Sequence, residues 1–137
     1  VYKISSAGVD MNISATEANV NAIRSAYELW EEKFTSLEKI IIDLDSDAIR
    51  SEEAYDKIEE IKSTMEEKYN ELQALNAKQN NNVILSGLVD LYDRGVQSLN
   101  GILSQTLSDK VAISSKIKYT NIDMLMQYKD YMEQITK

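Results

Sequence analysis

Hydrophobic residues recur every three or four positions through the first third of the chain. The members of this stripe are Val20, Ile23, Tyr27, Trp30, Phe34, Leu37, Ile41 and Leu44. Their spacings alternate between three and four, which is the a and d pattern of a helix that packs lengthwise against other helices. The pattern predicts a helix from about residue 15 to about residue 44. At 1.5 Å per residue this helix is about 45 Å long, a length typical of helical bundles.

Three further segments have a helical period. The second extends from about residue 52 to 77 with a narrow apolar stripe, the third from about 82 to 107 with a broad one, and the fourth from about 110 to 136. The positions expected to face inward in the fourth segment are Ile113, Ile117, Met124, Leu125, Tyr128, Tyr131, Met132 and Ile135. One kinked helix is the alternative to two separate helices over the third and fourth segments.

Turn and capping residues stand between these segments. Ser14 and Glu17 match a capping box at the start of the first helix. The acidic run at 43–47 predicts its end, and Ser51 is a candidate cap for the second helix. Ser108-Asp109 predicts a turn and a cap before the fourth helix.

These signals predict an all-α fold, an elongated antiparallel bundle of three to four long helices with coiled-coil-like packing. The chain has no proline and four glycines, so very few positions force the backbone to turn. Residues 1–12 lack helical periodicity and are expected to form an extended or loosely ordered lead-in. Residues 13–137 are expected to form a single helical-bundle domain.

The residue types that are missing exclude most catalytic chemistry. Among 137 residues there is no cysteine and no histidine, so thiolate nucleophiles, zinc–thiolate sites and the commonest general base are absent. Asp43, Asp45 and Asp47 resemble the first ligands of a calcium loop, but alanines occupy the glycine and glutamate positions of that loop, at 48 and 54. We therefore expect no enzyme activity, no metal site and no cofactor.

Charge narrows the choice of partners. The net charge of −8 disfavours nucleic acids and anionic membrane surfaces, because both require clustered Lys and Arg. Residues 1–76 hold 17 acidic and 8 basic residues, whereas residues 77–137 hold 6 and 7. The nearly neutral second half either contributes more of the core or also faces a partner.

No apolar run in the chain approaches the roughly 18 residues that span a bilayer. The chain starts at Val1 rather than Met, which is typical of a mature or trimmed fragment. We therefore expect an extracytoplasmic protein that is secreted, lipid-anchored or part of a receptor ectodomain.

Five side chains are candidates for interaction or ligand contacts. Arg24 and Arg94 lie near the seams of their helices, where an arginine can clamp a ligand carboxylate or cover the seam with its stem. Trp30 is either a core residue or a partner hot spot. Tyr128 and Tyr131, which cluster with another tyrosine at position 119, suit either an interface or the rim of the core.

The expected function is that of a non-enzymatic interaction or structural module, which presents a helical face to another protein or to a copy of itself. The alternative is an extracytoplasmic four-helix ligand-sensing domain of a membrane receptor. That alternative predicts a small-molecule ligand between helices near Arg24 or Arg94. It also requires the first helix to begin, and the last helix to end, at the same end of the bundle.

Overall fold

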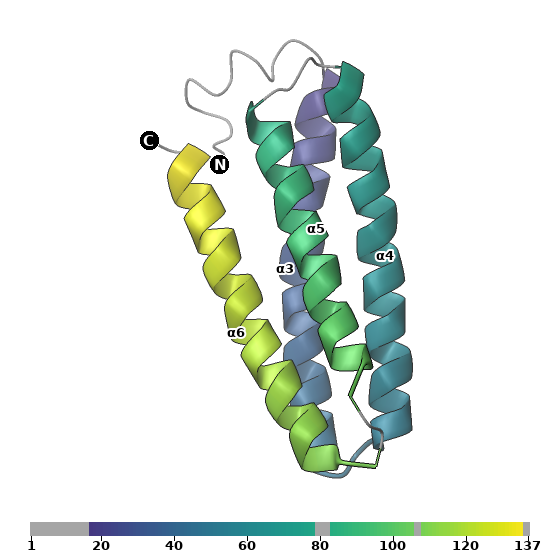
Figure 1. Ribbon diagram of the computed structural model, residues 1–137. Helices are drawn as coiled ribbons and strands as arrows, with labels where there is room; N and C mark the ends of the chain where they lie inside the picture. The colour runs from purple at the N-terminus through teal and green to yellow at the C-terminus, as the bar shows by residue number, and fades with distance from the viewer. Residues whose placement is uncertain (1–16, 79–82, 106–107, 136–137) are drawn as a thin grey trace.

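Four long helices follow one another in the computed structural model, which describes residues 17–78, 83–105 and 108–135. They are α3 (Glu17–Asp45), α4 (Ser51–Lys78), α5 (Val83–Leu103) and α6 (Lys110–Ile135). The helices pack side by side and each runs antiparallel to the next (Figure 1). The predicted all-α bundle is confirmed, and α5 and α6 are two separate helices rather than one kinked helix.

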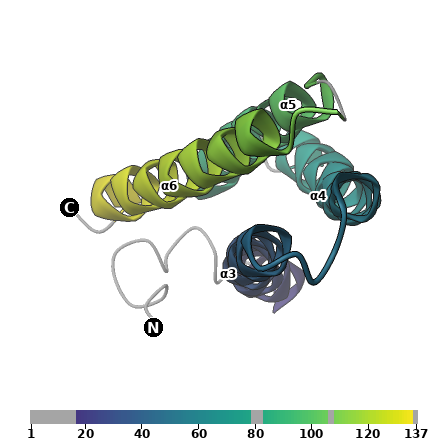
Figure 2. The same cartoon turned by 90° about the horizontal axis from the view of Figure 1, so that it is seen from below.

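Each of these helices has two neighbours. Helices α4 and α6 flank α3, and the same two helices flank α5, so α3 and α5 lie across the bundle from each other (Figure 2). The closest packing is between α4 and α5, where the broad apolar stripe of α5 meets the narrow stripe of α4. This unequal packing matches the sequence, because a broad stripe has neighbours on more than one side.

The apolar stripe of α3 builds one side of the core as its spacing predicts, except at Phe34, which is only half-buried and lies outside the core cluster. Ile23, Trp30, Leu37 and Leu44 are fully buried and follow one another at intervals of seven residues, or about two turns. The other helices contribute buried residues at helical spacings. These are Ala54, Ile58, Ile61, Met65 and Leu72 from α4, Ile84, Leu85, Leu88, Leu91, Tyr92, Leu99 and Ile102 from α5, and Ile113, Ile117, Met124 and Tyr131 from α6. Together they form one continuous core along the bundle axis.

The acidic turn between α3 and α4 is a helix C-cap of the Schellman type. The Ala48 N–H donates to the Asp43 carbonyl at 2.8 Å and the Asp47 N–H donates to the Leu44 carbonyl at 3.2 Å. Asp47 has a φ of 64°, the left-handed conformation that this motif requires and that aspartate tolerates better than most residues. The predicted helix end in this run is therefore confirmed, and backbone hydrogen bonds explain it.

Two helix ends in the structure lie a few residues or fewer from the predicted positions. Helix α4 begins at Ser51 itself, so Arg50 occupies the capping position, and its N–H donates to the Glu53 carboxylate at 3.3 Å. Helix α5 ends at Leu103 rather than near residue 107. Just beyond this end, the Ser104 hydroxyl donates to the Gly101 carbonyl at 2.8 Å and the Gln105 N–H donates to the Ile102 carbonyl at 3.0 Å.

The other two predicted caps have different outcomes. The Asp109 carboxylate accepts the Ala112 N–H at 3.0 Å, which confirms the predicted cap of α6. Ser14, the predicted cap of the first helix, lies outside the described residues, as does the lead-in over 1–12.

Candidate interaction surface

Five aromatic side chains from α3, α5 and α6 meet inside the bundle. Trp30 packs edge-to-face on Tyr92, with ring centroids 5.3 Å apart, and stacks on Tyr128 at 6.2 Å. Tyr27 makes edge contacts with Tyr131 at 6.0 Å and with Tyr128 at 6.3 Å. These separations are favourable for aromatic pairs. The cluster therefore ties three helices together at one level of the bundle.

Hydrogen bonds fix the phenols of this cluster. The Tyr92 hydroxyl donates to the Ala26 carbonyl at 2.5 Å. The Tyr131 hydroxyl donates to the Ile84 carbonyl at 3.1 Å and also lies 3.2 Å from the Tyr27 hydroxyl. Each bond joins residues on different helices, so these tyrosines set the positions of the helices relative to one another.

Burial governs the ionisation of these phenols. The pKa values of Tyr92, Tyr128 and Tyr131 are all raised above the ordinary tyrosine value, chiefly because the charged phenolate would lose its hydration. The Tyr128 hydroxyl also donates to the Glu31 carboxylate at 3.0 Å, which raises its pKa further. A tyrosine is already neutral at pH 7, and the raised pKa values keep these phenols neutral to a higher pH, as hydrogen-bond donors of the core.

The sequence-predicted contact residues divide between the core and the surface. Trp30 is 1% exposed and Tyr131 is 6% exposed, so both belong to the core, whereas Tyr128 lies at its rim. Arg24 is exposed on α3, and Arg94 is exposed on α5, where it pairs with Asp90 one turn earlier. The two arginines do not meet at one site, and a ligand beside either of them stays a prediction.

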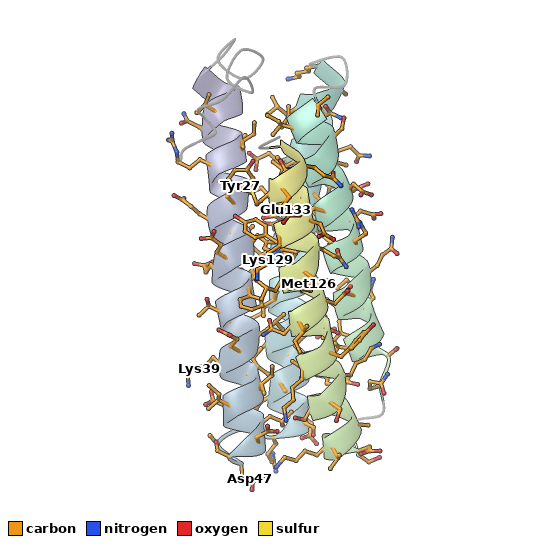
Figure 3. All side chains as sticks on the ribbon, turned by 90° about the vertical axis from the view of Figure 1, so that its left-hand side faces the viewer. Tyr27, Lys39, Asp47, Met126, Lys129 and Glu133 are labelled. Atoms are coloured by element: carbon orange, nitrogen blue, oxygen red, sulfur yellow. The ribbon has the colours of Figure 1, made fainter. Side chains whose placement is uncertain are left out.

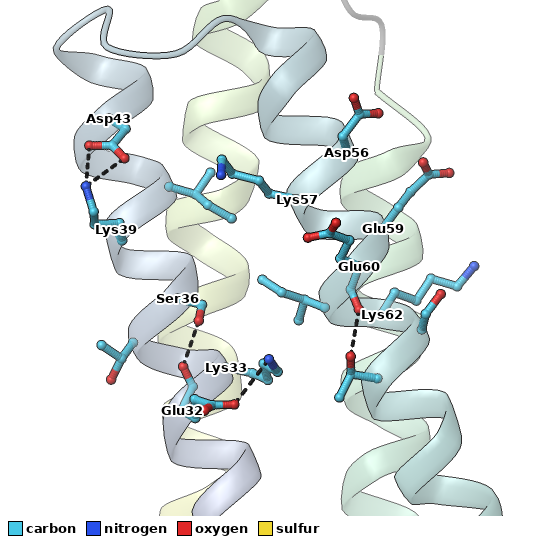
Figure 4. Close-up of a pocket in the computed structure, with 15 residues that line it drawn as sticks. Glu32, Lys33, Ser36, Lys39, Asp43, Asp56, Lys57, Glu59, Glu60 and Lys62 are labelled. Atoms are coloured by element: carbon cyan, nitrogen blue, oxygen red, sulfur yellow. Dashed lines mark hydrogen bonds and ion pairs between the residues drawn. The ribbon is translucent and has the colours of Figure 1, made fainter.

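A groove of about 1210 Å³ separates the outer sides of α3 and α4 (Figure 4). Its floor contains Ile40 and Ile61, which are almost fully buried. The charged side chains on its walls are Glu32, Lys33, Lys39, Asp43, Asp56, Lys57, Glu59, Glu60 and Lys62. Lys39 and Asp43 form an ion pair on one of these walls at 2.9 Å, and both residues belong to α3. This is an open, polar groove, whereas small-molecule sites are mostly apolar and enclosed.

A different surface stands out on α6, on the side turned away from the core. Tyr119, Ile122 and Met126 are 66%, 62% and 52% exposed, and their spacings of three and four place them in one stripe along the helix. We call this stripe the outer α6 face. Figure 3 looks at the bundle from the side on which α6 lies and labels Met126, Lys129 and Glu133 along this helix. Large apolar side chains that gather on one exposed stripe are typical of a surface that binds another chain.

Sequence reasoning missed Ile122 and Met126, and it grouped Tyr119 with tyrosines that lie elsewhere. The inward side of α6 contains three buried polar residues, Ser114, Thr120 and Asn121, at 5%, 2% and 7% exposure. Polar residues inside and apolar residues outside blur the helical period, so the pattern alone did not separate the two sides. One sequence feature did point to this surface. The charge of residues 77–137 is nearly neutral, which is one expectation for a half of the chain that faces a partner.

The charge of α6 also differs from that of the other described helices. Helix α3 carries seven acidic and three basic residues, and α4 carries eight and four. Helix α6 carries three acidic residues and four lysines, and α5 carries two acidic residues and one arginine. Because the whole chain has a charge of −8, α6 offers the approach with the least electrostatic repulsion for an acidic partner.

Polar bonds hold the N-terminal part of α6 against the end of α3. The Ser114 hydroxyl donates to the Asp45 carboxylate at 2.6 Å, and the Lys118 ammonium pairs with the same carboxylate at 2.9 Å. Lys110 forms an ion pair with Asp47. Together with the burial of Ile113, Ile117 and Met124, these contacts help to set the rotation of α6 about its own axis, which leaves Tyr119 on the outside.

Replacing Ser114 with alanine is expected to raise the pKa of Asp45 towards its ordinary value. The Ser114 hydroxyl is the largest cause of the lowered pKa, ahead of Lys118. A lowered pKa stabilises the fold above the ordinary carboxyl value, and this stabilisation is lost as the pH falls through the lowered pKa. NMR titration of the Asp45 carboxyl measures the shift. The Ser36→Ala variant is the control, because the Ser36 hydroxyl donates to the Glu32 carbonyl of its own helix at 3.0 Å. An equal shift in both variants would contradict the assignment.

Comparison of the chain with models of protein families, with curated proteins and with solved structures finds no match. Among the residues that the structure describes, no helix combines the length and apolar character needed to cross a membrane. What the chain does is therefore inferred from its own surface.

Proposed function

We propose that this protein is a non-enzymatic interaction module that binds a protein chain through the outer α6 face. The observation that carries the proposal is the exposed stripe of Tyr119, Ile122 and Met126 on a helix whose other side is already buried. A surface helix of a monomer normally has one apolar side. A second apolar side on the same helix indicates a second packing partner.

The surroundings of this stripe resemble the anatomy of an interface. Lys118, Asp123 and Lys129 flank the apolar side chains, so an apolar centre has a polar rim. Of the other exposed large apolar residues, Val111 lies at the start of α6, whereas Ile42 lies on α3 and Val83 on α5. Single exposed residues of the kind seen on α3 and α5 are common on protein surfaces. The concentration on α6 is therefore what distinguishes this face.

Photo-crosslinking tests this function in the cells that produce the protein. A photoreactive amino acid is introduced at position 122, and at Glu66 on α4 as the matched exposed control. We expect a discrete adduct from position 122 whose protein component is identified by mass spectrometry, and no such adduct from position 66. Either another protein or a second copy of the chain supports the proposal. Equal labelling at both positions, or no adduct at either, contradicts it.

The second candidate is an extracytoplasmic ligand-sensing domain, and one observation favours it. Helix α3 begins and α6 ends at the same end of the bundle (Figure 1). The Tyr27–Tyr131 hydroxyl contact at 3.2 Å holds these parts of the two helices together. This is the arrangement that such a domain needs in order to pass a change between its first and last helices. The extracytoplasmic location belongs to both candidates and is likewise a proposal.

A further inference from the structure

The outer α6 face is complementary to the same face of a second copy that runs antiparallel to it. From residue 115 onwards its positions follow the a and d spacing of a coiled coil, with Tyr119, Ile122, Met126 and Lys129 in successive a and d places. In an antiparallel pair, an a position faces a d position of the other helix. A two-fold axis at the level of Met124 then places Ile122 opposite Met126 of the other copy, and Tyr119 opposite Lys129 of the other copy.

We infer that the partner of the outer α6 face is a second copy of this chain, docked antiparallel in this register. The inference rests on the proposed function and names its partner. A two-fold contact is isologous, so each pairing occurs twice and the surface closes on itself. The apolar centre consists of Ile122 and Met126 from both copies, four side chains that are each more than half exposed in the single chain.

The charges beside this centre also complement one another. In an antiparallel pair the e positions of the two helices face each other, which brings Lys116 near Asp130 of the other copy, twice. Lys129 also lies near the Tyr119 ring of the other copy, and an ammonium group over a tyrosine ring is favourable. The Lys116 ammonium already lies 5.7 Å from the centroid of the Tyr119 ring in the single chain, which shows that a cation can approach this ring.

One contact opposes the pairing. Asp123 lies at the e position nearest the axis, so it faces Asp123 of the other copy. Like charges at an interface weaken it. Since the apolar centre is also small, we expect a reversible dimer with a Kd on the order of tens of micromolar.

Sedimentation equilibrium of the full chain, from about 10 μM to about 1 mM, measures this dimer. We expect Ile122→Glu to remain monomeric throughout the range. We expect Lys116→Glu and Asp130→Lys each to weaken dimerisation by about 10-fold, and the double variant to recover to within about 3-fold of the original chain. Asp123→Asn is expected to strengthen the dimer. Lys57→Glu on α4 is the control and leaves the Kd unchanged, because it lies away from α6.

Disulfide trapping tests the register, because the chain has no cysteine of its own. When an Ile122→Cys variant is mixed with a Met126→Cys variant, the antiparallel register predicts that the mixed disulfide dimer dominates over both homodimers. A monomer at all concentrations overturns the inference, as does a double charge swap that does not recover. A photo-adduct from position 122 to another protein, or to residues 1–16 of the same chain, also overturns self-pairing. Of these two adducts, the one to another protein leaves the proposed function intact, whereas the one to residues 1–16 overturns it as well, so the two failures are distinguishable.

Discussion

Replacing Trp30 with alanine is expected to lower the free energy of unfolding by about 3–5 kcal/mol, the range typical of a fully buried tryptophan. The indole is 1% exposed and contacts the rings of Tyr92 and Tyr128. Its removal leaves a cavity where α3, α5 and α6 meet, and surrounding helices collapse only partly into such a space. Urea unfolding followed by circular dichroism measures the loss, which is a large part of the stability of a domain of this size.

Tyr119→Ala is the matched control for this loss. It removes an aromatic ring that is 66% exposed, so the expected change in the free energy of unfolding is within about 0.5 kcal/mol. Trp30→Phe is expected to cost clearly less than Trp30→Ala. The phenyl ring keeps part of the packing, and the substitution removes an indole N–H that has no hydrogen-bond partner in the structure. Equal losses in Trp30→Ala and Tyr119→Ala would show that the aromatic cluster does not stabilise the fold.

Gly95→Ala is expected to lower the free energy of unfolding by about 1–3 kcal/mol, the usual cost of overpacking a core. The expectation runs against helix propensity, which favours alanine over glycine by about 1 kcal/mol inside a helix. A methyl group at Gly95 would lie 2.9 Å from the Cη2 and Cζ3 atoms of Trp30 and 2.8 Å from the Cε atom of Met65. The indole ring is rigid and buried, so it can move aside only by disturbing the cluster.

Gly101→Ala is the control on the same helix. The nearest atom to its added methyl group is Cε of Lys116 at 3.5 Å, at the flexible end of a long side chain. This variant is expected to stabilise the protein by about 0.5 kcal/mol. If the indole causes the loss at Gly95, Gly95→Ala costs less in a Trp30→Phe background, because phenylalanine lacks the two clashing ring atoms. Equal stabilisation by Gly95→Ala and Gly101→Ala would refute the close contact.

Gly95 and Gly101 show what a sequence pattern can predict and what it cannot. Both lie in one apolar run, and the pattern treats them alike, as positions of close helix approach or of a bend. The structure separates them, because only Gly95 packs against Trp30. Which helix face meets which neighbour is a long-range property, and a local spacing of residues carries no information about it.

The candidate surface followed from sequence only in part. The nearly neutral second half of the chain indicated that α5 or α6 could face a partner. The residues chosen on aromatic character, Trp30 and Tyr131, proved to be buried, whereas Ile122 and Met126 are exposed. Ser114, Thr120 and Asn121 take up buried positions on α6. An apolar residue contributes to an interface only when the rotation of its helix leaves it outside, and the contacts of Asp45 with Ser114 and Lys118 help to set that rotation.

The sequence by itself determined the all-α class, the lengths of the helices to within a few residues and most of the core of α3. Helix formation and burial of a stripe depend on residues three and four positions apart, and these are neighbours in the chain as well as in space. Only the tertiary structure decided the separation of α5 from α6, the ring of four helices and the apolar stripe left on the outside of α6. These depend on contacts between residues as distant as Tyr27 and Tyr131, whose pairing follows from the packing of the whole bundle.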